Sequence, residues 1–288
     1  MTLRFSNDRH SPTVLEEIEQ IQQTAKVQSV AAADGLRIVW RKFGSGKPLV
    51  LLHGGHGDWM HWFRNVSALA TIREVWIPDL PGFGDSDNLD EPTFEGLCEA
   101  TLASLNTVIG AATPVDLAGF SFGGMVASAL ARRRPISRLV LVGSGGHGAP
   151  RREHPALLNW KKASTPEARI AMLHANVRTF MFHNAEAVGP LVEAIYAREC
   201  QRTRFHSRGS WGATTLKGLL GEAKVKPLLL WGDQDVTLAS PTAYSASLHD
   251  AGVDHDFTLI PGAGHWLQCE AADSVNALMK SFYTDDAA

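Results

Sequence analysis

The 288-residue sequence lacks several features that would place it in a specialised class of protein. Its three cysteines, Cys98, Cys200 and Cys269, are few, odd in number and widely spaced, which argues for a reducing compartment and against a disulfide framework or a metal cluster. No apolar run reaches the roughly 18 residues of a membrane span. The amino terminus lacks the basic start and apolar run of a signal peptide. We therefore expect a cytoplasmic protein that does not bind membranes.

The chain also lacks a strong excess of either charge. Its 27 basic and 30 acidic residues give a net charge of −3, which argues against a nucleic-acid-binding protein. Apolar residues make up 44% and charged residues 20% of the chain, as is usual for a globular protein. No set of metal ligands is evident, so we expect neither a metal nor a cofactor. We expect the partner of this protein to be a small-molecule substrate. The oligomeric state is left open, a homodimer included.

Short apolar runs alternate with helical patterns from Val27 onward. The expected strands are Val27–Ala33, Leu36–Phe43, Pro48–Leu52, Glu74–Pro78, Val115–Ala118, Arg138–Gly143, Pro227–Trp231 and Asp256–Ile260, with a hairpin turn at Asp34-Gly35. The expected helices between them are Asp58–Leu69, Phe94–Ile109, Gly123–Arg133, Pro241–His249 and Ala272–Phe282. This alternation predicts an α/β fold with a mostly parallel, eight-stranded sheet and helices on both faces.

The alternation stops between the sixth and seventh expected strands. That stretch is too long for a simple connection and carries helical patterns of its own, at Pro155–Lys162, Pro166–Phe182 and Glu186–Thr203. We interpret residues 145–216 as a helical cap over the carboxyl edge of the sheet. Residues 27–144 and 217–288 then form the core, and residues 1–26 form a tail with a short helix.

The sharpest local motif is Gly119-Phe120-Ser121-Phe122-Gly123, a G-x-S-x-G sequence that occurs once. It lies between an expected strand and an expected helix, the context in which the serine projects its hydroxyl above the sheet. The motif therefore predicts that Ser121 is a nucleophile. The alternative is a buried serine at a junction of small residues.

A serine nucleophile needs a base, and the base needs a carboxylate that orients it. His265 lies in a glycine-rich loop after the last expected strand, and Asp235 lies in a turn after the preceding strand. We prefer Asp235 to Asp233, which sits closer to the strand end and suits bonds to local backbone N–H groups. The chain order of serine, aspartate and histidine is the one expected for this arrangement.

Acyl transfer also needs two backbone N–H donors for the developing oxyanion. One is predicted at Phe122, the residue after the nucleophile, and the other in the loop His53-Gly54-Gly55-His56-Gly57 after the third strand. Gly55 is the preferred donor in this loop, with Gly54 and His56 as alternatives. We interpret His53 as a buried hydrogen-bonding residue.

These motifs, together with Asp79-Leu80-Pro81-Gly82-Phe83-Gly84-Asp85-Ser86, resemble those of the α/β-hydrolase superfamily. The resemblance runs from about Val27 to Tyr283 and implies the α/β-hydrolase fold. It implies Ser121 as nucleophile, Asp235 as acid and His265 as base. It also implies oxyanion donors at Gly55 and Phe122.

A narrower resemblance concerns Gly143–Gly148 and His265–Glu270, which look like the carbon–carbon hydrolases of aromatic ring-cleavage pathways. Those enzymes usually have methionine after the nucleophile, where this chain has Phe122, and they hold a substrate carboxylate with a cap arginine. The predicted substrate-binding residues are Gly54, His56, Trp266, Arg198 and Arg202.

Three functions remain open from the sequence. The first is a serine hydrolase for an ester-type acyl bond. The second is a carbon–carbon bond hydrolase for a keto-dienoic acid. The third is a ligand receptor on the same fold that has little or no turnover, because a fold does not guarantee its chemistry.

Overall fold

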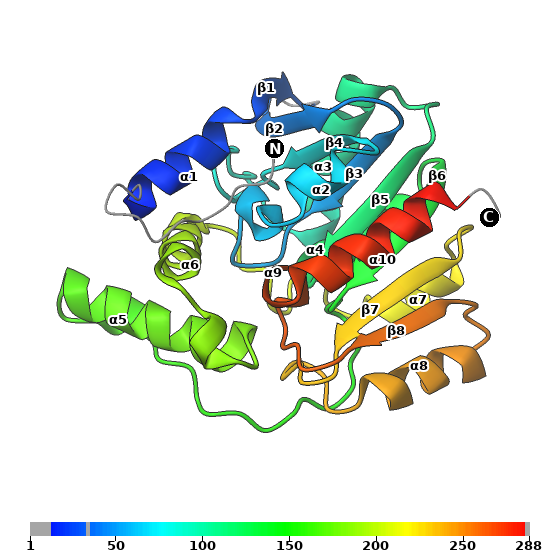
Figure 1. Cartoon of the computed structure of the whole chain (residues 1–288). Coiled ribbons are helices and arrows are strands. Elements are labelled where there is room, and N and C mark those ends of the chain that lie inside the picture. Colours follow the sequence, from blue (N-terminus) through cyan, green and yellow to red (C-terminus); the bar gives the residue numbers. More distant parts are fainter. Residues whose placement is uncertain (1–12, 33–34, 286–288) are drawn as a thin grey trace.

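The computed structural model describes residues 13–32 and 35–285 (Figure 1). One eight-stranded sheet has the strand order β1-β2-β4-β3-β5-β6-β7-β8. Its strands are β1 Lys26–Ala31, β2 Arg37–Gly44, β3 Pro48–Leu52, β4 Glu74–Pro78, β5 Val115–Phe120, β6 Ile136–Val142, β7 Pro227–Gly232 and β8 Asp256–Ile260. β2 pairs antiparallel with both β1 and β4, and the remaining pairs are parallel. The predicted fold class is confirmed. The predicted hairpin turn falls partly on Ala33 and Asp34, outside the described residues.

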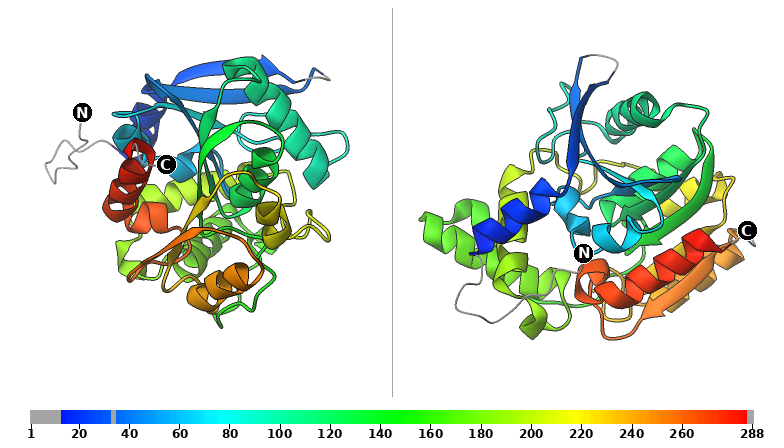
Figure 2. Two further views of the ribbon diagram at one scale, coloured as in Figure 1. Left: turned by 90° about the vertical axis from the view of Figure 1, so that its right-hand side faces the viewer. Right: turned by 45° about the horizontal axis from the view of Figure 1, so that its top comes forward.

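The helices cover both faces of this sheet. They are α1 Val14–Gln23, α2 Val66–Leu69, α3 Phe94–Ile109, α4 Phe122–Ala131, α5 Pro166–Asn176, α6 Pro190–Arg202, α7 Leu216–Gly221, α8 Pro241–Asp250, α9 Leu267–Glu270 and α10 Ala272–Thr284. Single turns occur at η1 Trp59–Trp62, η2 Trp160–Lys162, η3 Val177–Met181 and η4 Ala185–Ala187. In the left view of Figure 2, α10 and α3 lie on opposite sides of the sheet. One apolar cluster lies on each side of the sheet. Met279 of α10 belongs to the first cluster, and Leu97 of α3 belongs to the second.

Residues 145–216, called the cap below, connect β6 to the segment that leads into β7. Helices α5 and α6 stand to one side of the sheet in Figure 1, and α1 packs beside α6. None of the described helices is both long and apolar enough to cross a membrane.

Two expected helices differ from the structure. The helix expected at Asp58–Leu69 is broken into η1 and α2. Between them, the buried side-chain amide of Asn65 donates to the carbonyl of Gln268 and to the side chain of Asn276. The helix expected at Pro155–Lys162 is reduced to η2. There the amide of Asn176 binds both the N–H and the carbonyl of Leu158, at 2.8 and 2.9 Å, and so takes the groups that a helix would use.

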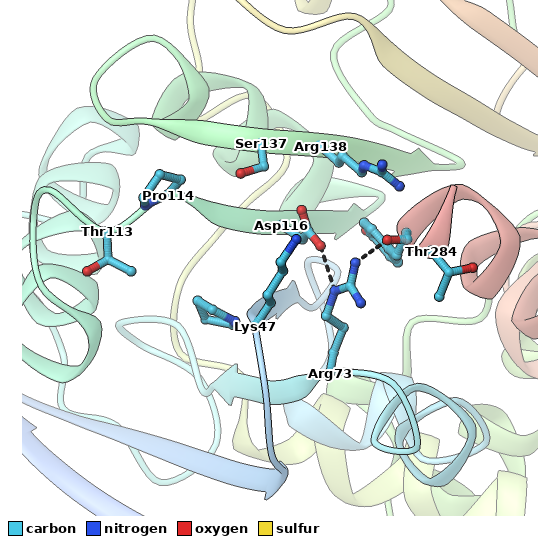
Figure 3. A pocket seen from close by; sticks show the side chains of 10 residues that line it. Lys47, Arg73, Thr113, Pro114, Asp116, Ser137, Arg138 and Thr284 are labelled. Atoms are coloured by element: carbon cyan, nitrogen blue, oxygen red, sulfur yellow. Dashed lines mark hydrogen bonds and ion pairs between the residues drawn. The ribbon is translucent and has the colours of Figure 1, made fainter. Parts of the chain in front are cut away.

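The edge of the sheet formed by the amino ends of the parallel strands carries a buried ionic link (Figure 3). Nε of Arg73, the residue before β4, lies 2.8 Å from Oδ2 of Asp116 on β5. The same guanidinium donates to the carbonyl of Tyr283 on α10. A cavity of about 770 Å³ lies here, lined also by Lys47 and Arg138. The link joins α10 to the sheet at the edge opposite to that of Ser121.

Candidate active site

Ser121 lies at the sharp turn between β5 and α4. Its φ of +52° is the one positive φ of a non-glycine residue in the described part of the chain. Such a conformation is strained and persists only where the surroundings hold it. Here the N–H of Ser121 donates to the carbonyl of Val142 at 2.9 Å, and its own carbonyl accepts the N–H groups of Gly124 and Gly145 at 3.0 and 2.9 Å. The turn is thus fixed from three directions, and the hydroxyl faces the carboxyl edge of the sheet.

Close packing explains the glycines on either side of Ser121. A Cβ on Gly119 would lie 2.2 Å from the carbonyl oxygen of Gly123. A Cβ on Gly123 would lie 2.5 Å from the carbonyl oxygens of Leu52 and His53. The start of α4 therefore rests directly against the end of β3. This contact brings the loop after β3, residues 53–57, beside the serine; we call it the oxyanion loop, after the role predicted for it from the sequence.

Ser121, His265 and Asp235 form a continuous chain of hydrogen bonds. Nε2 of His265 lies 3.0 Å from Oγ of Ser121, and Nδ1 lies 2.9 Å from Oδ2 of Asp235. The histidine and the aspartate are buried. Asp233, the other candidate acid, instead accepts the N–H of Gly262 at 2.8 Å. The structure therefore brings the three predicted residues together with the geometry of a base that is oriented by a carboxylate.

The surroundings keep Asp235 charged and His265 in place. Burial raises the pKa of Asp235, but the adjacent His265 and the hydrogen bonds from Thr237 lower it by more, so the pKa lies below its usual value. The rings of Phe120 and Phe180 pack on the imidazole of His265, with centroid distances of 5.1 and 5.5 Å. Phe180 comes from the cap, so the cap covers the ring of His265.

Gly55 and Phe122 lie beside each other next to the serine. A Cβ on Gly55 would stand 3.4 Å from Cβ of Phe122. Phe122 is the first residue of α4, where an N–H has no partner within the helix. Within the described chain, neither this N–H nor that of Gly55 has a protein acceptor. Two neighbouring donors of this kind suit an oxyanion.

His53 sets the direction of the Gly55 N–H. Nε2 of His53 accepts the N–H of Leu80 at 2.9 Å, so the proton of the neutral ring is on Nδ1, which donates to the carbonyl of Gly54 at 2.9 Å. The N–H of Gly57 donates to the same oxygen at 3.2 Å. In a planar trans peptide, the Gly54 carbonyl and the Gly55 N–H point in opposite directions. The two hydrogen bonds that fix the Gly54 carbonyl therefore also fix the direction of the Gly55 N–H.

A cavity of about 950 Å³ opens above Ser121. The oxyanion loop, Phe122 and His265 form its floor, and the cap supplies Trp160, Phe180, Met181, Tyr196, Cys200 and Trp211. Three basic residues, Arg151, Lys161 and Arg208, also line it, and no described residue that lines it is acidic. The lining thus combines apolar and polar groups with three exposed basic residues, which we call the positive rim, although the whole chain carries a net charge of −3. No cluster of three or more metal-binding side chains occurs among the described residues.

Two predicted substrate-binding arginines do not line this cavity. Nη1 of Arg198 lies 3.0 Å from Oδ2 of Asp58. Arg202 pairs with Asp85 and lies 4.0 Å from Asp58. Buried and half-buried carboxylates draw both guanidinium groups away from the cavity. The structure therefore does not bring these two predicted residues to the cavity, and their role in substrate binding stays a prediction.

Trp266, also predicted to bind substrate, does not line the cavity either. Its side chain is fully buried beside His61, and its Nε1 donates to the carbonyl of His61 at 2.9 Å. Gly54 and His56, the other two residues predicted to bind substrate, do line the cavity.

Sequence reasoning missed Thr237, Lys161 and Phe180. Thr237 bonds to Asp235, and its only signal was its place two residues after the acid. Lys161 and Phe180 lie in the cap, where helical periodicity shows which residues share a face but does not show how the helices sit on the core. Their position depends on tertiary packing.

Comparison with known proteins agrees with this architecture. A model of the alpha/beta hydrolase family matches residues 49–278. The chain is 30% identical over 267 residues to 2-hydroxy-6-oxo-6-phenylhexa-2,4-dienoate hydrolase of Burkholderia cepacia, covering 85% of this chain and 91% of the relative. The enzyme of the same name from Comamonas testosteroni is 27% identical over 277 residues, covering 90% and 94%.

Among solved structures, an esterase from Rhodococcus sp. ECU1013 superposes with a TM-score of 0.75 at 21% identity, covering 90% of this chain and 98% of that one. At this identity the likeness concerns the fold alone. The family match and the full-length relatives carry the assignment further. The chain belongs to the alpha/beta hydrolase family and is a hydrolase.

Proposed function

We propose that this hydrolase uses Ser121 to cleave an ester-type acyl bond in a small molecule that carries a negatively charged group. The observation that carries the proposal is the continuous hydrogen-bond chain from Ser121 through His265 to Asp235 at the floor of the cavity. A serine hydroxyl in contact with an oriented base is an activated nucleophile.

The steps follow from the positions of the donors and acceptors. His265 takes the hydroxyl proton as Oγ of Ser121 bonds to the carbonyl carbon, and the carbonyl oxygen becomes an anion that faces the N–H groups of Phe122 and Gly55. When the tetrahedral intermediate collapses, the leaving alcohol takes the proton from His265 and the acyl group stays on Ser121. A water molecule, deprotonated by His265, then releases the acid and restores the serine.

The charge of the substrate is inferred from the rim of the cavity. Arg151, Lys161 and Arg208 line it without an acidic neighbour in the lining. Exposed positive charges that share one opening attract an anion and raise its local concentration. The apolar cap residues would contact the remainder of the acyl or alcohol group.

Carbon–carbon hydrolysis of a keto-dienoic acid is the second candidate. Similarity to the two dienoate hydrolases supports it. The ion pairs of the cap arginines count against this candidate. Arg198 pairs with Asp58 and Arg202 pairs with Asp85, so neither arginine is placed to hold a substrate carboxylate. The ester candidate does not depend on an arginine at either of these two positions, so we rank it first.

The test is labelling by a fluorophosphonate, followed by intact-mass measurement. Wild-type protein should gain one adduct that maps to Ser121, and Ser121→Ala should gain none. Ser67→Ala, which changes an exposed serine on α2, should label like the wild type. The absence of an adduct on folded wild-type protein would contradict the proposal.

A substrate panel then separates the two candidates. It contains a neutral aryl ester, an aryl ester whose acyl chain ends in a carboxylate, and a 2-hydroxy-6-oxo-dienoic acid. We expect the highest kcat/KM for the anionic ester. Faster turnover of the dienoic acid than of either ester would favour the second candidate.

A further inference from the structure

His61 lines the cavity and connects the oxyanion loop to the cap. Its Nδ1 accepts the N–H of Gly54 at 3.0 Å. Burial, together with neighbouring histidines, lowers the pKa of His61 well below its usual value, so the ring is neutral near pH 7. A neutral imidazole has one proton, and an Nδ1 that accepts leaves that proton on Nε2. The oxyanion loop therefore depends on one tautomer of His61.

The acceptor nearest this proton comes from the cap. Nε2 of His61 lies 3.3 Å from Oε2 of Glu199 on α6, and both atoms are buried without a well-aligned hydrogen-bond partner in the described chain. The other oxygen, Oε1, accepts the N–H of Asp58 at 3.3 Å. Glu199 is only 1% exposed and does not line the cavity, so the proposed mechanism gives it no contact with substrate.

The carboxyl group of Glu199 can accept a hydrogen bond from the Nε2–H of His61 whether it is ionised or protonated. Burial and the charge of Asp58 raise its pKa well above the usual range. A carboxyl group offers an oxygen as acceptor whether or not it is ionised.

The ring of His61 has little room to move. A Cβ on Gly57 would lie 2.1 Å from its Cε1 atom. The rings of Trp266 and Phe120 pack on it with centroid distances of 4.9 and 5.2 Å. Because the ring is fixed, its environment controls mainly which nitrogen carries the proton.

We propose that Glu199 is a positioning residue for the oxyanion loop, holding the proton of His61 on Nε2 so that Nδ1 remains the acceptor for Gly54. Without the acceptor on Glu199, a proton on Nε2 would be buried with no acceptor nearby, which costs free energy and offsets the gain from the Gly54 hydrogen bond. A proton on Nδ1 would face the N–H of Gly54, and two donors in contact would push the loop and the neighbouring Gly55 N–H out of place. The inference rests on the proposed function, since it matters for catalysis only if Gly55 stabilises an oxyanion.

The experiment compares Glu199→Leu, which removes both oxygens at similar volume, with Glu199→Gln, which keeps one acceptor oxygen. We expect kcat of Glu199→Leu to fall about tenfold or more with KM within about threefold of wild type, because a misplaced oxyanion donor costs up to about 10²–10³ in kcat. Glu199→Gln should recover most of kcat. If Glu199→Leu does not fold, Glu199→Met replaces it, with the same expectation.

Glu193 provides a matched control on the same helix. Its carboxylate pairs with Arg178 at 2.8 Å inside the cap, away from the oxyanion loop. Glu193→Leu should lower the Tm without changing kcat. If Glu199 merely anchored the cap, then Glu199→Leu would resemble Glu193→Leu, with a lower Tm, a changed KM and an unchanged kcat. That result would overturn the inference.

A second readout does not depend on activity. Long-range ¹H–¹⁵N spectra of the histidine rings report the tautomer, with His61 assigned by its loss in His61→Phe. Wild type and Glu199→Gln should show the proton on Nε2, and Glu199→Leu should show it on Nδ1. An unchanged tautomer in Glu199→Leu would also overturn the inference. If wild-type protein cleaves no ester, the proposed function fails, whereas the tautomer still tests the link between Glu199 and His61.

Discussion

Thr237 binds one carboxylate oxygen of Asp235 twice. Its N–H and its hydroxyl both donate to Oδ1 of Asp235, each at 2.7 Å. The other oxygen, Oδ2, is thereby left to face Nδ1 of His265 at 2.9 Å. Each oxygen of the carboxylate thus has its own partner, and the aspartate cannot rotate without losing hydrogen bonds.

This arrangement predicts the behaviour of Asp235→Asn. The amide oxygen should stay with the two donors of Thr237, so the amide NH₂ would face Nδ1 of His265. Nδ1 would then have to accept, and Nε2 would carry a proton toward Ser121 and could not take one from it. We expect kcat to fall about 10³–10⁴-fold with little change in KM.

Steady-state kinetics on the preferred ester checks this prediction. Asp233→Asn is the matched control, because that carboxylate binds the N–H of Gly262 and does not reach His265. It should keep kcat within about threefold of wild type, since only a local turn bond changes. A kcat of Asp235→Asn above a tenth of the wild-type value would contradict the proposed role of the acid.

The core and the triad could be predicted from the sequence because both depend on local patterns. The fully buried strands β5 and β7 are largely apolar. Ser121 follows β5 directly, and Asp235 and His265 lie in the turns after β7 and β8. The carboxyl ends of parallel strands meet at one edge, so chain order alone placed the three residues together.

The cap contacts could not be predicted in the same way. Arg198 and Arg202 have the spacing of a basic helix face, but their partners Asp58 and Asp85 are more than a hundred residues away in sequence. Periodicity gives the face of a helix and not the surface it meets. For the same reason, a role for Glu199 could not be predicted from the sequence, because that role depends on where α6 lies against the oxyanion loop.

The positive rim of the cavity predicts selective recognition of an anionic ester. Lys161 lines the cavity and its neighbour Lys162 does not, so Lys161→Gln and Lys162→Gln form a matched pair. We expect Lys161→Gln to raise KM for the carboxylate-bearing ester about two- to fivefold, as exposed ion pairs are worth up to about 1 kcal/mol. KM for the neutral ester should not change.

Salt provides an independent check on that prediction. Raising the ionic strength should raise KM of the wild type for the anionic ester and have less effect in Lys161→Gln, because salt screens exposed charges. Equal effects of both lysine substitutions on KM would mean that the rim does not contact the charged group.

The neutral, buried His53 predicts loss of stability in mild acid. Burial lowers its pKa to about 4, against about 6.5 in an unfolded chain. Below about pH 6.5 the unfolded state takes up a proton that the folded state does not, so the folded state loses stability as the pH falls from 6.5 toward 4. Between pH 7 and pH 5 this one group lowers the free energy of unfolding by about 2 kcal/mol.

Urea unfolding at both pH values measures this effect. His53→Gln should lose about 2 kcal/mol less than wild type between pH 7 and pH 5, whatever its stability at pH 7. Wild type must be compared with His53→Gln because Asp79 changes the stability in the opposite direction. Burial and the charge of Asp58 raise its pKa to about 6, so this group adds stability to the folded state as the pH falls. An identical pH dependence in both proteins would show that His53 is not held neutral.

The link between Arg73 and Asp116 predicts a loss of stability without a loss of catalysis (Figure 3). Both side chains are buried, and Arg73 also holds the carbonyl of Tyr283. Arg73→Met would leave the carboxylate of Asp116 without its partner, which costs about 3–5 kcal/mol for a buried pair. The link lies at the edge of the sheet opposite to Ser121, so kcat of the folded fraction should stay at the wild-type value.

Urea unfolding and kinetics on the same preparation test both parts. Adding Asp116→Asn to Arg73→Met should restore part of the stability, because a neutral amide is less costly to bury than an unpaired charge. Arg132→Met is the matched control, since Arg132 pairs with an exposed carboxylate, that of Glu222, and exposed pairs contribute at most about 1 kcal/mol. If Arg73→Met and Arg132→Met lost equal stability, the buried pair would contribute no more to the free energy of unfolding than the exposed pair, and the prediction would be wrong.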